Sequence, residues 1–197
     1  MRRVRQISLA AAFLISAAAG YAQEPATNPG TATPNFKVQI WGDIAADFSV
    51  RIERYLELRR TLEEGLPPLA LTDDPADIGR AEHALAERIR VARAGAKRGD
   101  IFTPDIRADF RRVLLLEVDS ETRIAIMDDN PGAFSSRING TYSKDRALST
   151  VPGNILAALP RLPDDIQYRF LGPDLILHDT RANVILDRLR CAIRCGD

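Results

Sequence analysis

Two cysteines near the end of the sequence are the residues whose type and spacing most clearly permit chemistry. Cys191 and Cys195 are the only two cysteines in the chain of 197 residues. In a helix this spacing would place their Cα atoms about 6.2 Å apart, within the range that a disulfide spans. A local disulfide is the simplest prediction for such a pair in an oxidising compartment. The alternative is a metal site in which His178 joins both thiolates, because zinc sites also use closely spaced cysteines.

His178 and Asp179 suggest a second chemistry, in which a serine would act as nucleophile. The candidate nucleophiles are Ser135, Ser136, Ser143 and Ser149. Consecutive residues of a strand point to opposite faces, however, so the imidazole and the carboxylate would not act together. The sequence also contains neither Gly-x-Ser-x-Gly nor His-Glu-x-x-His. We therefore predict a strand-end histidine and an aspartate that accepts hydrogen bonds from its own turn.

Acidic residues are candidates for a hydrolase, which would use two carboxylates as acid and base. Asp179 and Asp187, in the C-terminal apolar runs, are the first pair to test by replacement. The consecutive aspartates at 73–74, 128–129 and 164–165 lie beside proline or asparagine, where aspartate commonly caps helices and turns. Spacing alone singles out none of these acids as catalytic.

A basic run suggests an anion-binding face on the second predicted helix and its exit. Five cations occur within eleven residues, namely Arg88, Arg90, Arg93, Lys97 and Arg98. A solvated helix face, with Glu82 and Glu87 nearby, explains the same pattern. Binding of an anion by this helix face is the more specific alternative.

The N-terminal residues predict export. Three arginines within the first five residues precede an apolar run over residues 7–19. Gly20 and Ala22 then supply the small residues that signal peptidase requires, so we expect residues 1–22 to be a signal peptide with cleavage before Gln23. The apolar run is too short to span a bilayer, which takes about 20 residues. We expect a periplasmic or secreted protein without a membrane span after cleavage.

The charge balance weighs against some classes of partner. The chain carries 27 basic and 27 acidic residues, and the signal peptide would remove three arginines and no acid, which leaves a net charge of −3. A nearly neutral chain is not typical of a general nucleic-acid or membrane-surface binder. No glycine-rich phosphate-binding motif is found, and we predict no cofactor. The remaining length, about 175 residues, suffices for one domain with its own core.

After a flexible linker over residues 23–35, we expect a single α+β domain over residues 36–197. The linker is rich in proline, threonine, glycine and alanine. The helical part should cover residues 43–128. Apolar residues recur there at intervals of three, four and seven over residues 44–62, which predicts a first helix capped by Asp43.

Two more helices are expected to begin at capping motifs. Asp74, followed by proline, should cap the second helix, which Gly99 would end. Thr103, also followed by proline, should cap the third, and residues 120–127 predict a short fourth helix. The first two helices would form a hairpin, with the third packed across it.

The rest of the domain is predicted to be an irregular segment, residues 129–165, followed by a β-meander, residues 166–189. Within the irregular segment, Asn139 and Gly140 predict a tight hairpin turn. Short turns make neighbouring strands antiparallel, and the helices should cover one face of this sheet. The strands are expected at residues 166–171, 175–179 and 184–189.

Several phrases together resemble a family of exported, signal-peptide-bearing bacterial proteins for which no activity is established. The phrases are EGLPPL at 64–69, AGAKRGDIFTP at 94–104, YRFLG at 168–172, DLIL at 174–177 and ANVI at 182–185. They follow one another through the mature chain, so the similarity is to a whole protein. The resemblance implies export and a shared architecture, and it implies no catalytic residues. The cysteine-bearing tail differs from the family's usual ending.

The sequence favours a non-catalytic exported protein that binds a protein or a component of the cell envelope. This hypothesis depends on the missing catalytic motifs, the amphipathic helices and the irregular residues 129–153, which are long enough for a recognition loop. One alternative is a periplasmic metal-binding or metal-homeostasis protein that uses His178 and the cysteines. The other is a carboxylate-dependent hydrolase of envelope material.

Overall fold

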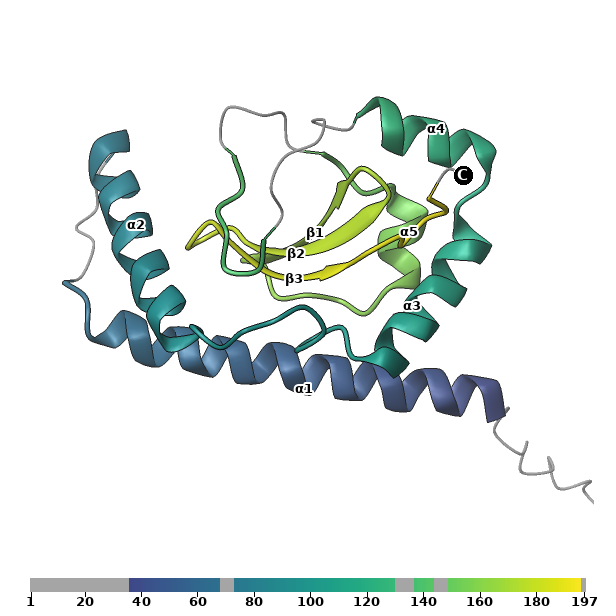
Figure 1. Cartoon of the computed structure of the whole chain (residues 1–197), viewed down its shortest axis with the longest axis horizontal. Coiled ribbons are helices and arrows are strands. Elements are labelled where there is room, and N and C mark those ends of the chain that lie inside the picture. The colour runs from purple at the N-terminus through teal and green to yellow at the C-terminus, as the bar shows by residue number, and fades with distance from the viewer. Residues whose placement is uncertain (1–35, 68–72, 130–136, 144–148, 196–197) are drawn as a thin grey trace, which may run out of the picture. The chain divides into compact units, whose positions relative to one another are not determined.

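The longest helix is α1, Phe36–Glu64, which runs beneath the sheet in Figure 1. The computed structural model describes side chains from residue 42 onward and covers residues 36–67, 73–129, 137–143 and 149–195. The predicted signal peptide and linker lie outside these ranges.

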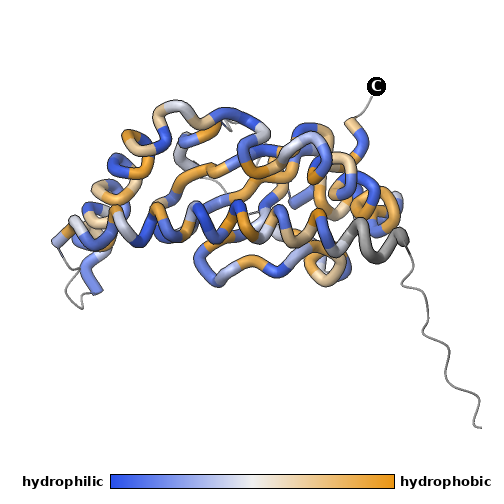
Figure 2. The backbone as a smooth tube through the Cα atoms, turned by 90° about the horizontal axis from the view of Figure 1, so that it is seen from below, coloured by the Kyte–Doolittle hydropathy of each residue, from blue (hydrophilic) through white to orange (hydrophobic). Residues whose placement is uncertain are grey.

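α1 contains the first predicted helix and is longer than expected at its N-terminal end. The predicted stripe is confirmed at Phe48, Ile52 and Tyr55, which are buried at intervals of four and three. Apolar and hydrophilic residues alternate along α1 in Figure 2. Asp43 lies inside the helix and is not its cap, because the helix continues through Gly42 toward residue 36. A single glycine weakens a helix without ending it.

Three further helices follow in the predicted order. They are α2, Pro75–Ala92, α3, Pro104–Glu117, and α4, Ser120–Asp128. The predicted caps are confirmed, because Asp74 accepts a hydrogen bond from the N–H of Ala76 at 2.8 Å and Thr103 accepts one from Ile106 at 3.5 Å. α1 contacts both α2 and α3, and Figure 1 shows α2 rising steeply from α1. A short helix, α5, Gly153–Ala158, contacts α3.

α2 ends at Ala92, earlier than the glycine at residue 99 predicts. The N–H of Arg93 closes the helix by donating to Ile89 at 2.8 Å. The residues that follow form turns, and Gly99 adopts a φ of 96°, a left-handed conformation that glycine accepts readily. Farther along this connection, a buried carboxylate of the sheet accepts backbone N–H groups, as described below.

The C-terminal strands form an antiparallel sheet, as predicted. Its strands are β1, Ile166–Leu171, β2, Asp174–Asp179, and β3, Val184–Leu189, in the order β1-β2-β3. The register pairs Tyr168 with Leu177, and Leu177 in turn with Asp187. An irregularity between Leu177 and His178 interrupts the pairing of β2 with β3. Positive φ angles at Gly172 and Asn183 close the two turns.

The main core lies between the helices and one face of the sheet. An aromatic cluster occupies its centre, where the ring of Phe48 lies 5.0 Å from that of Phe110 and 5.9 Å from that of Phe102. Tyr168 of β1 completes this cluster, at 6.3 Å from Phe48. Rings at these separations contribute more than their buried area alone.

The sheet is buried on both faces, which corrects the prediction of one covered face. All six residues of β2 are buried. On the face away from the main core, Tyr142 packs in a second, smaller cluster with Leu171, Ile176 and Ile185. The strand pattern could not reveal this cover, because Tyr142 belongs to an irregular segment far from the strands in the sequence.

Both outer strands are covered along part of their free edges. Asn139 donates its N–H to Ile185 of β3, and Gly140 accepts the N–H of Ile185, both at 2.8 Å. The predicted turn at Asn139 and Gly140 therefore exists, but it binds β3 and joins no hairpin among the described residues. On β1, the Ser149 hydroxyl donates to the carbonyl of Phe170 at 2.5 Å. Such covering prevents strands of other chains from pairing there.

Within the described residues, no helix is both long and apolar enough to cross a lipid bilayer.

Candidate functional site

Asp179, at the end of β2, is fully buried and has four hydrogen-bond donors. Its Oδ1 accepts the N–H groups of Arg181 and Ala182, at 2.9 and 3.0 Å, as the prediction of a turn-capping aspartate requires. Its Oδ2 accepts the hydroxyl of Tyr55 at 2.5 Å and Arg59 at 3.1 Å. A carboxylate so fully engaged is not placed to take a proton from a substrate.

The two α1 residues that contact Asp179 are held in defined protonation states. Burial, followed by the charge of Asp179, raises the pKa of Tyr55 far above its ordinary value. Tyr55 therefore stays a hydrogen-bond donor. Burial also opposes the charge of Arg59, but the neighbouring carboxylates outweigh it and the net pKa of Arg59 is raised. Arg59 also forms an ion pair with Asp165, over 2.9 Å between Nη2 and Oδ2, and so links Asp165 to Asp179.

Asp187, in β3, performs the same structural role for the connection between α2 and α3. Its carboxylate accepts the N–H groups of Gly99, Ile101 and Phe102, at 3.0, 2.8 and 2.8 Å. It also accepts the N–H of Arg188, and its own exposure is 0%. These contacts hold the connection against the sheet. The two acids proposed for a hydrolase thus contact different segments of the fold.

His178 lies on the opposite face of the sheet from Asp179. Its Nε2 is 2.9 Å from Oδ1 of Asn183, and its ring is 5.1 Å from that of Tyr142. Burial lowers the pKa of His178, while the hydrogen bond to Asn183 opposes this shift. A buried, neutral imidazole with no carboxylate bonded to it is not a general base for a serine.

The cysteines form a disulfide, with an S–S distance of 2.03 Å. Neither thiol is therefore free to join His178 as a metal ligand. Among the residues that the structure describes, no group of three or more His, Cys, Asp or Glu could hold a metal ion. The structure thus gives no support to the metal site considered from the sequence.

The candidate nucleophiles do not form a catalytic group either. Ser149 is buried and donates to Phe170 in β1, so its hydroxyl supports the edge of the sheet. Ser143 is half-buried, and no hydrogen bond joins it to His178. Ser135 and Ser136 lie outside the described residues.

The five cations predicted as one anion-binding face are divided by the structure. Arg93 turns inward, where its Nη2 donates to the carbonyl of Leu186 at 3.0 Å and its guanidinium lies 5.3 Å from the ring centre of Tyr55. Arg90 donates to the carbonyl of Asn139 at 3.0 Å. Arg88 donates to the carbonyl of Leu62 in α1. Within the described part of the chain, only Lys97 and Arg98 of this set remain exposed without such a contact to the backbone. The spacing of these cations in the sequence could not predict this division, because the long side chain of an arginine can reach from its helix to another segment.

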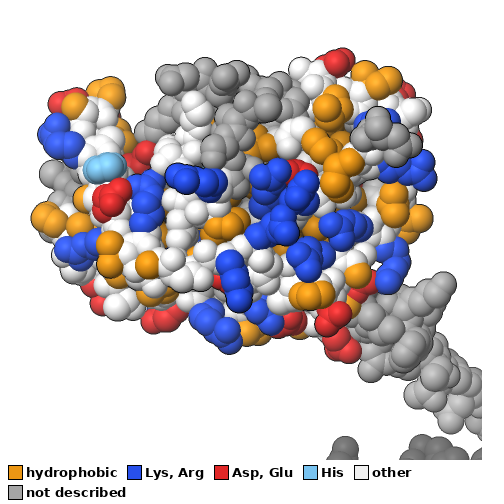
Figure 3. Space-filling model, viewed as in Figure 1, with side chains coloured by type: hydrophobic (Ala, Val, Ile, Leu, Met, Phe, Trp, Pro, Cys, Tyr) orange, Lys and Arg blue, Asp and Glu red, His pale blue; other side chains and the backbone are white. Residues whose placement is uncertain are grey.

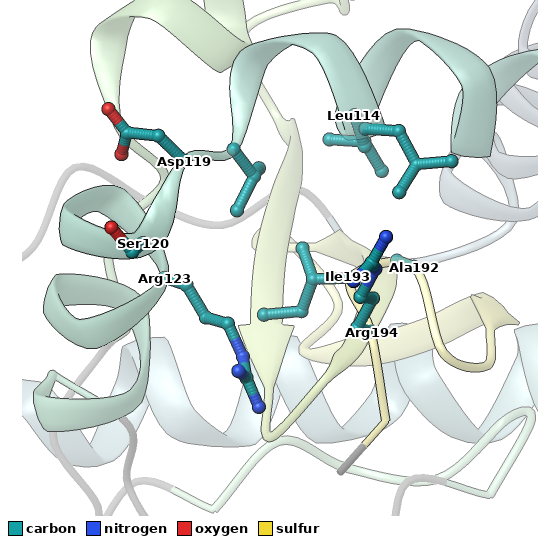
Figure 4. Close-up of a pocket in the computed structure, with 9 residues that line it drawn as sticks. Leu114, Asp119, Ser120, Arg123, Ala192, Ile193 and Arg194 are labelled. Carbon is teal, nitrogen blue, oxygen red and sulfur yellow. The ribbon is translucent and has the colours of Figure 1, made fainter.

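A pocket of about 260 Å³, which we call the tail pocket, lies between α3, α4 and the C-terminal tail (Figure 4). Arg123 and Ile193 extend toward each other from opposite sides of it, and Asp119 points away. Residues 192–194 lie between the two cysteines, so the disulfide loop forms one wall. The pocket is lined by Leu114, Leu115, Val118, Asp119, Ser120, Arg123, Ala192, Ile193 and Arg194.

Large apolar side chains stand exposed on the two helices that form the tail pocket. Leu116 is 81% exposed, Ile124 61% and Leu115 59%, and Met127 is also exposed. We call these four residues and the tail pocket the α3–α4 surface. Hydrophobic side chains are visible in Figure 3 on the side where Figure 1 places α3 and α4. Exposed apolar side chains scattered singly are normal, but a group beside a pocket is typical of an interaction site.

Three larger hollows lie elsewhere on the described part of the molecule, and one of them, of about 390 Å³, lies between α1 and the connection from α2 to α3. The other two are less completely described. One, of about 370 Å³, lies between the end of α1, α2 and the turn after β2, and the other, of about 660 Å³, lies beside β1. The first adjoins residues 68–72 and the second adjoins residues 144–148, which are outside the described ranges. The walls of the tail pocket and of the hollow of about 390 Å³ are described throughout, and of these two only the tail pocket adjoins a group of exposed apolar side chains.

Comparisons with protein-family models, with curated proteins and with solved structures found no match. The function therefore has to be inferred from the geometry of this chain.

Proposed function

We propose that the protein acts outside the cytoplasm by binding another protein through the α3–α4 surface, and that it catalyses no reaction there. The observation that carries this proposal is that α3 and α4, which line a pocket with a disulfide-closed wall, carry four exposed apolar side chains, namely Leu115, Leu116, Ile124 and Met127. The buried acids of the sheet support it, because Asp179 and Asp187 are engaged by internal donors.

The chemistry of the α3–α4 surface indicates the kind of segment that would bind. Leu114, Val118 and Ile193 give the tail pocket an apolar lining that fits one aliphatic or aromatic anchor. Arg123 and Arg194 stand at its rim and are exposed. A partner segment with an apolar anchor followed by Asp or Glu would therefore complement both the shape and the charge.

Export is part of this proposal. The charged and apolar pattern of residues 1–22 supports it, and so does the disulfide, which persists in oxidising compartments. Cell fractionation followed by intact-mass measurement tests it. We expect the protein outside the cytoplasm, beginning at Gln23, and a full-length cytoplasmic protein would contradict export.

Site-specific photo-crosslinking in cells tests the docking surface. A crosslinker placed at position 116 or 124 should capture one and the same protein, while one placed at Val50, which is 54% exposed on α1, should not. The captured protein is then purified and its affinity is measured with Leu116→Asp/Ile124→Asp. We expect at least about tenfold weaker binding, because a charge replaces buried apolar contact.

The control is Val50→Asp, which adds one charge at an exposed apolar position on another helix and is compared with Ile124→Asp alone, at a position of similar exposure. Unchanged affinity of the double variant would refute the proposal, as would equal capture from all three positions. If the captured protein is a second copy of this chain, the surface serves self-association and not the binding of a different protein. Sedimentation of the purified protein distinguishes these two cases.

A further inference from the structure

Arginines from three separate segments meet beside β3. Arg107 and Arg111 lie one turn apart on α3, and Arg111 donates to the carbonyl of Arg190 at 2.8 Å and more weakly to that of Cys191 at 3.4 Å. These contacts place α3 alongside the residues that follow β3. Asp174 links Arg188 to this junction, because one of its carboxylate oxygens pairs with the guanidinium of Arg188 and the other accepts the N–H of Cys191 at 2.7 Å.

The connection between α2 and α3 brings a further arginine to the same place. The carboxylate of Asp187 binds the N–H groups of Gly99 and of Arg188, so the backbone that follows Arg98 lies beside β3. A Cβ atom added to Gly99 would lie 3.8 Å from Nη1 of Arg107, which shows that Arg107 reaches over this connection. We call the resulting set the arginine surface. It consists of Arg98, Arg107, Arg111, Arg188 and Arg190.

The positive charge of the arginine surface is only partly balanced. Asp174 forms an ion pair with Arg188, and Asp187 is fully buried beneath the set. Arg98 and Arg190 are exposed. Figure 3 shows Lys and Arg side chains crossing the middle of this face with few acidic side chains among them. A local excess of positive charge on a nearly neutral protein indicates an anion as partner.

We infer that the arginine surface binds an extended polyanion whose charges are phosphate or carboxylate groups. The planar guanidinium donates two parallel hydrogen bonds to such groups, which a lysine cannot do. The cations come from three segments and are spread beside β3, which suits several charges along one chain better than a single small anion. Backbone contacts fix Arg111 in position, so this part of the surface is formed before the ligand binds.

This inference is independent of the proposed protein partner. The α3–α4 surface uses the apolar end of α3 and α4, whereas the arginine surface uses the first half of α3 and β3. It also differs from the face predicted by sequence, because Arg98 is the only member that the two sets share.

Binding of long-chain inorganic polyphosphate to the full mature protein tests the inference. We expect binding at about 50 mM salt that weakens steeply as salt increases, because bound counterions are released. Arg107→Gln/Arg190→Gln should bind at least about tenfold more weakly, and the slope of its salt dependence should fall by about one for each guanidinium that no longer reaches a phosphate. Arg190→Gln alone should also weaken the binding of polyphosphate, and because Arg190 is exposed and lies outside α3, this variant leaves the helix unchanged.

The matched control is Arg60→Gln/Arg80→Gln, which removes the same charge from exposed positions on α1 and α2. Equal weakening by both double variants would overturn the inference, because net charge alone would then explain binding. No measurable binding of polyphosphate at about 50 mM salt would overturn it too. Binding to vesicles rich in phosphatidylglycerol, without binding to polyphosphate, would assign the surface to a membrane instead.

Discussion

The hydroxyl of Tyr55 donates to the carboxylate of Asp179 over 2.5 Å, which ties the middle of α1 to the end of β2. Asp187 does the equivalent for the connection before α3 by accepting the N–H of Phe102. Two acids of one small sheet thus hold separate helical segments in place. Buried carboxylates elsewhere often indicate catalysis, but here their partners belong to the fold.

Replacing Tyr55 by phenylalanine should destabilise the protein more than the same replacement at Tyr168. Tyr55→Phe removes a hydrogen bond to a buried charge, whose loss costs roughly 1.5–3 kcal/mol, whereas Tyr168→Phe removes one to the carbonyl of Pro160, whose loss costs about 1 kcal/mol. The free energy of unfolding, measured in urea at neutral pH, checks the order. An equal loss in the free energy of unfolding of both variants would contradict a larger contribution from the hydrogen bond to Asp179.

Replacing Asp187 by asparagine should release the connection between α2 and α3. An amide has one acceptor oxygen, so in either orientation its NH₂ group faces N–H donors, which are those of Ile101 and Phe102 at one position or that of Arg188 at the other. We expect a loss of about 3 kcal/mol in the free energy of unfolding.

Hydrogen exchange of the Phe102 and Arg188 amides provides a local measurement, and at least one of the two should become faster in Asp187→Asn. The exposed Asp164 supplies a control, because Asp164→Asn makes the same chemical change outside the core. If both variants kept the parental stability and exchange, the structural role of Asp187 would be wrong.

The burial of His178 predicts a loss of stability in mild acid. Burial lowers the pKa of His178 below its ordinary value of 6.5, so above that pH both folded and unfolded chains carry a neutral imidazole. As the pH falls below about 6.5, the unfolded chain takes up a proton while the folded chain resists it, and stability decreases. Arg169 reinforces the resistance, and Glu82 and Asp179 weaken it.

Denaturation midpoints at about pH 7.5 and pH 5.5 test this prediction. The parental protein and His83→Gln, at an exposed position on α2, should lose stability between the two values by the same amount. His178→Gln should lose less, because it has no group to protonate there. An identical loss in all three proteins would exclude His178 as the cause.

Local signals in the sequence were sufficient for much of the fold. β1 and β3 have the predicted bounds, and β2 begins one residue earlier than predicted. The caps at Asp74 and Thr103 were predictable because a capping side chain binds N–H groups two or three residues away.

Contacts between distant segments were not predictable in the same way. Nothing near Gly99 in the sequence indicates that Asp187 will bind its N–H group, although an acid within the apolar run of β3 was a signal that it needed partners. The inward turn of Arg93 depends equally on where Leu186 comes to lie. The α3–α4 surface could not be foreseen either, because its pocket forms only when the tail folds back against α3 and α4.

The disulfide should control the order of the tail more than the stability of the domain. The loop between Cys191 and Cys195 is short, so its removal costs at most about 2 kcal/mol in the free energy of unfolding. It nevertheless encloses Ile193, whose side chain lines the tail pocket and whose N–H donates to Pro173 at 3.1 Å.

Reduction should therefore speed hydrogen exchange at the Ile193 amide, because the unlinked segment opens more readily than the sheet. The amide of Ile185 in β3, which donates to the carbonyl of Gly140 at the edge of the sheet, serves as the internal reference and should keep its protection. Cys191→Ser/Cys195→Ser should exchange as fast as the reduced protein and should not respond to reductant. If Ile193 exchanged equally slowly in all three forms, the packing of the tail alone would hold the wall of the pocket, and the disulfide would have no part in shaping the α3–α4 surface.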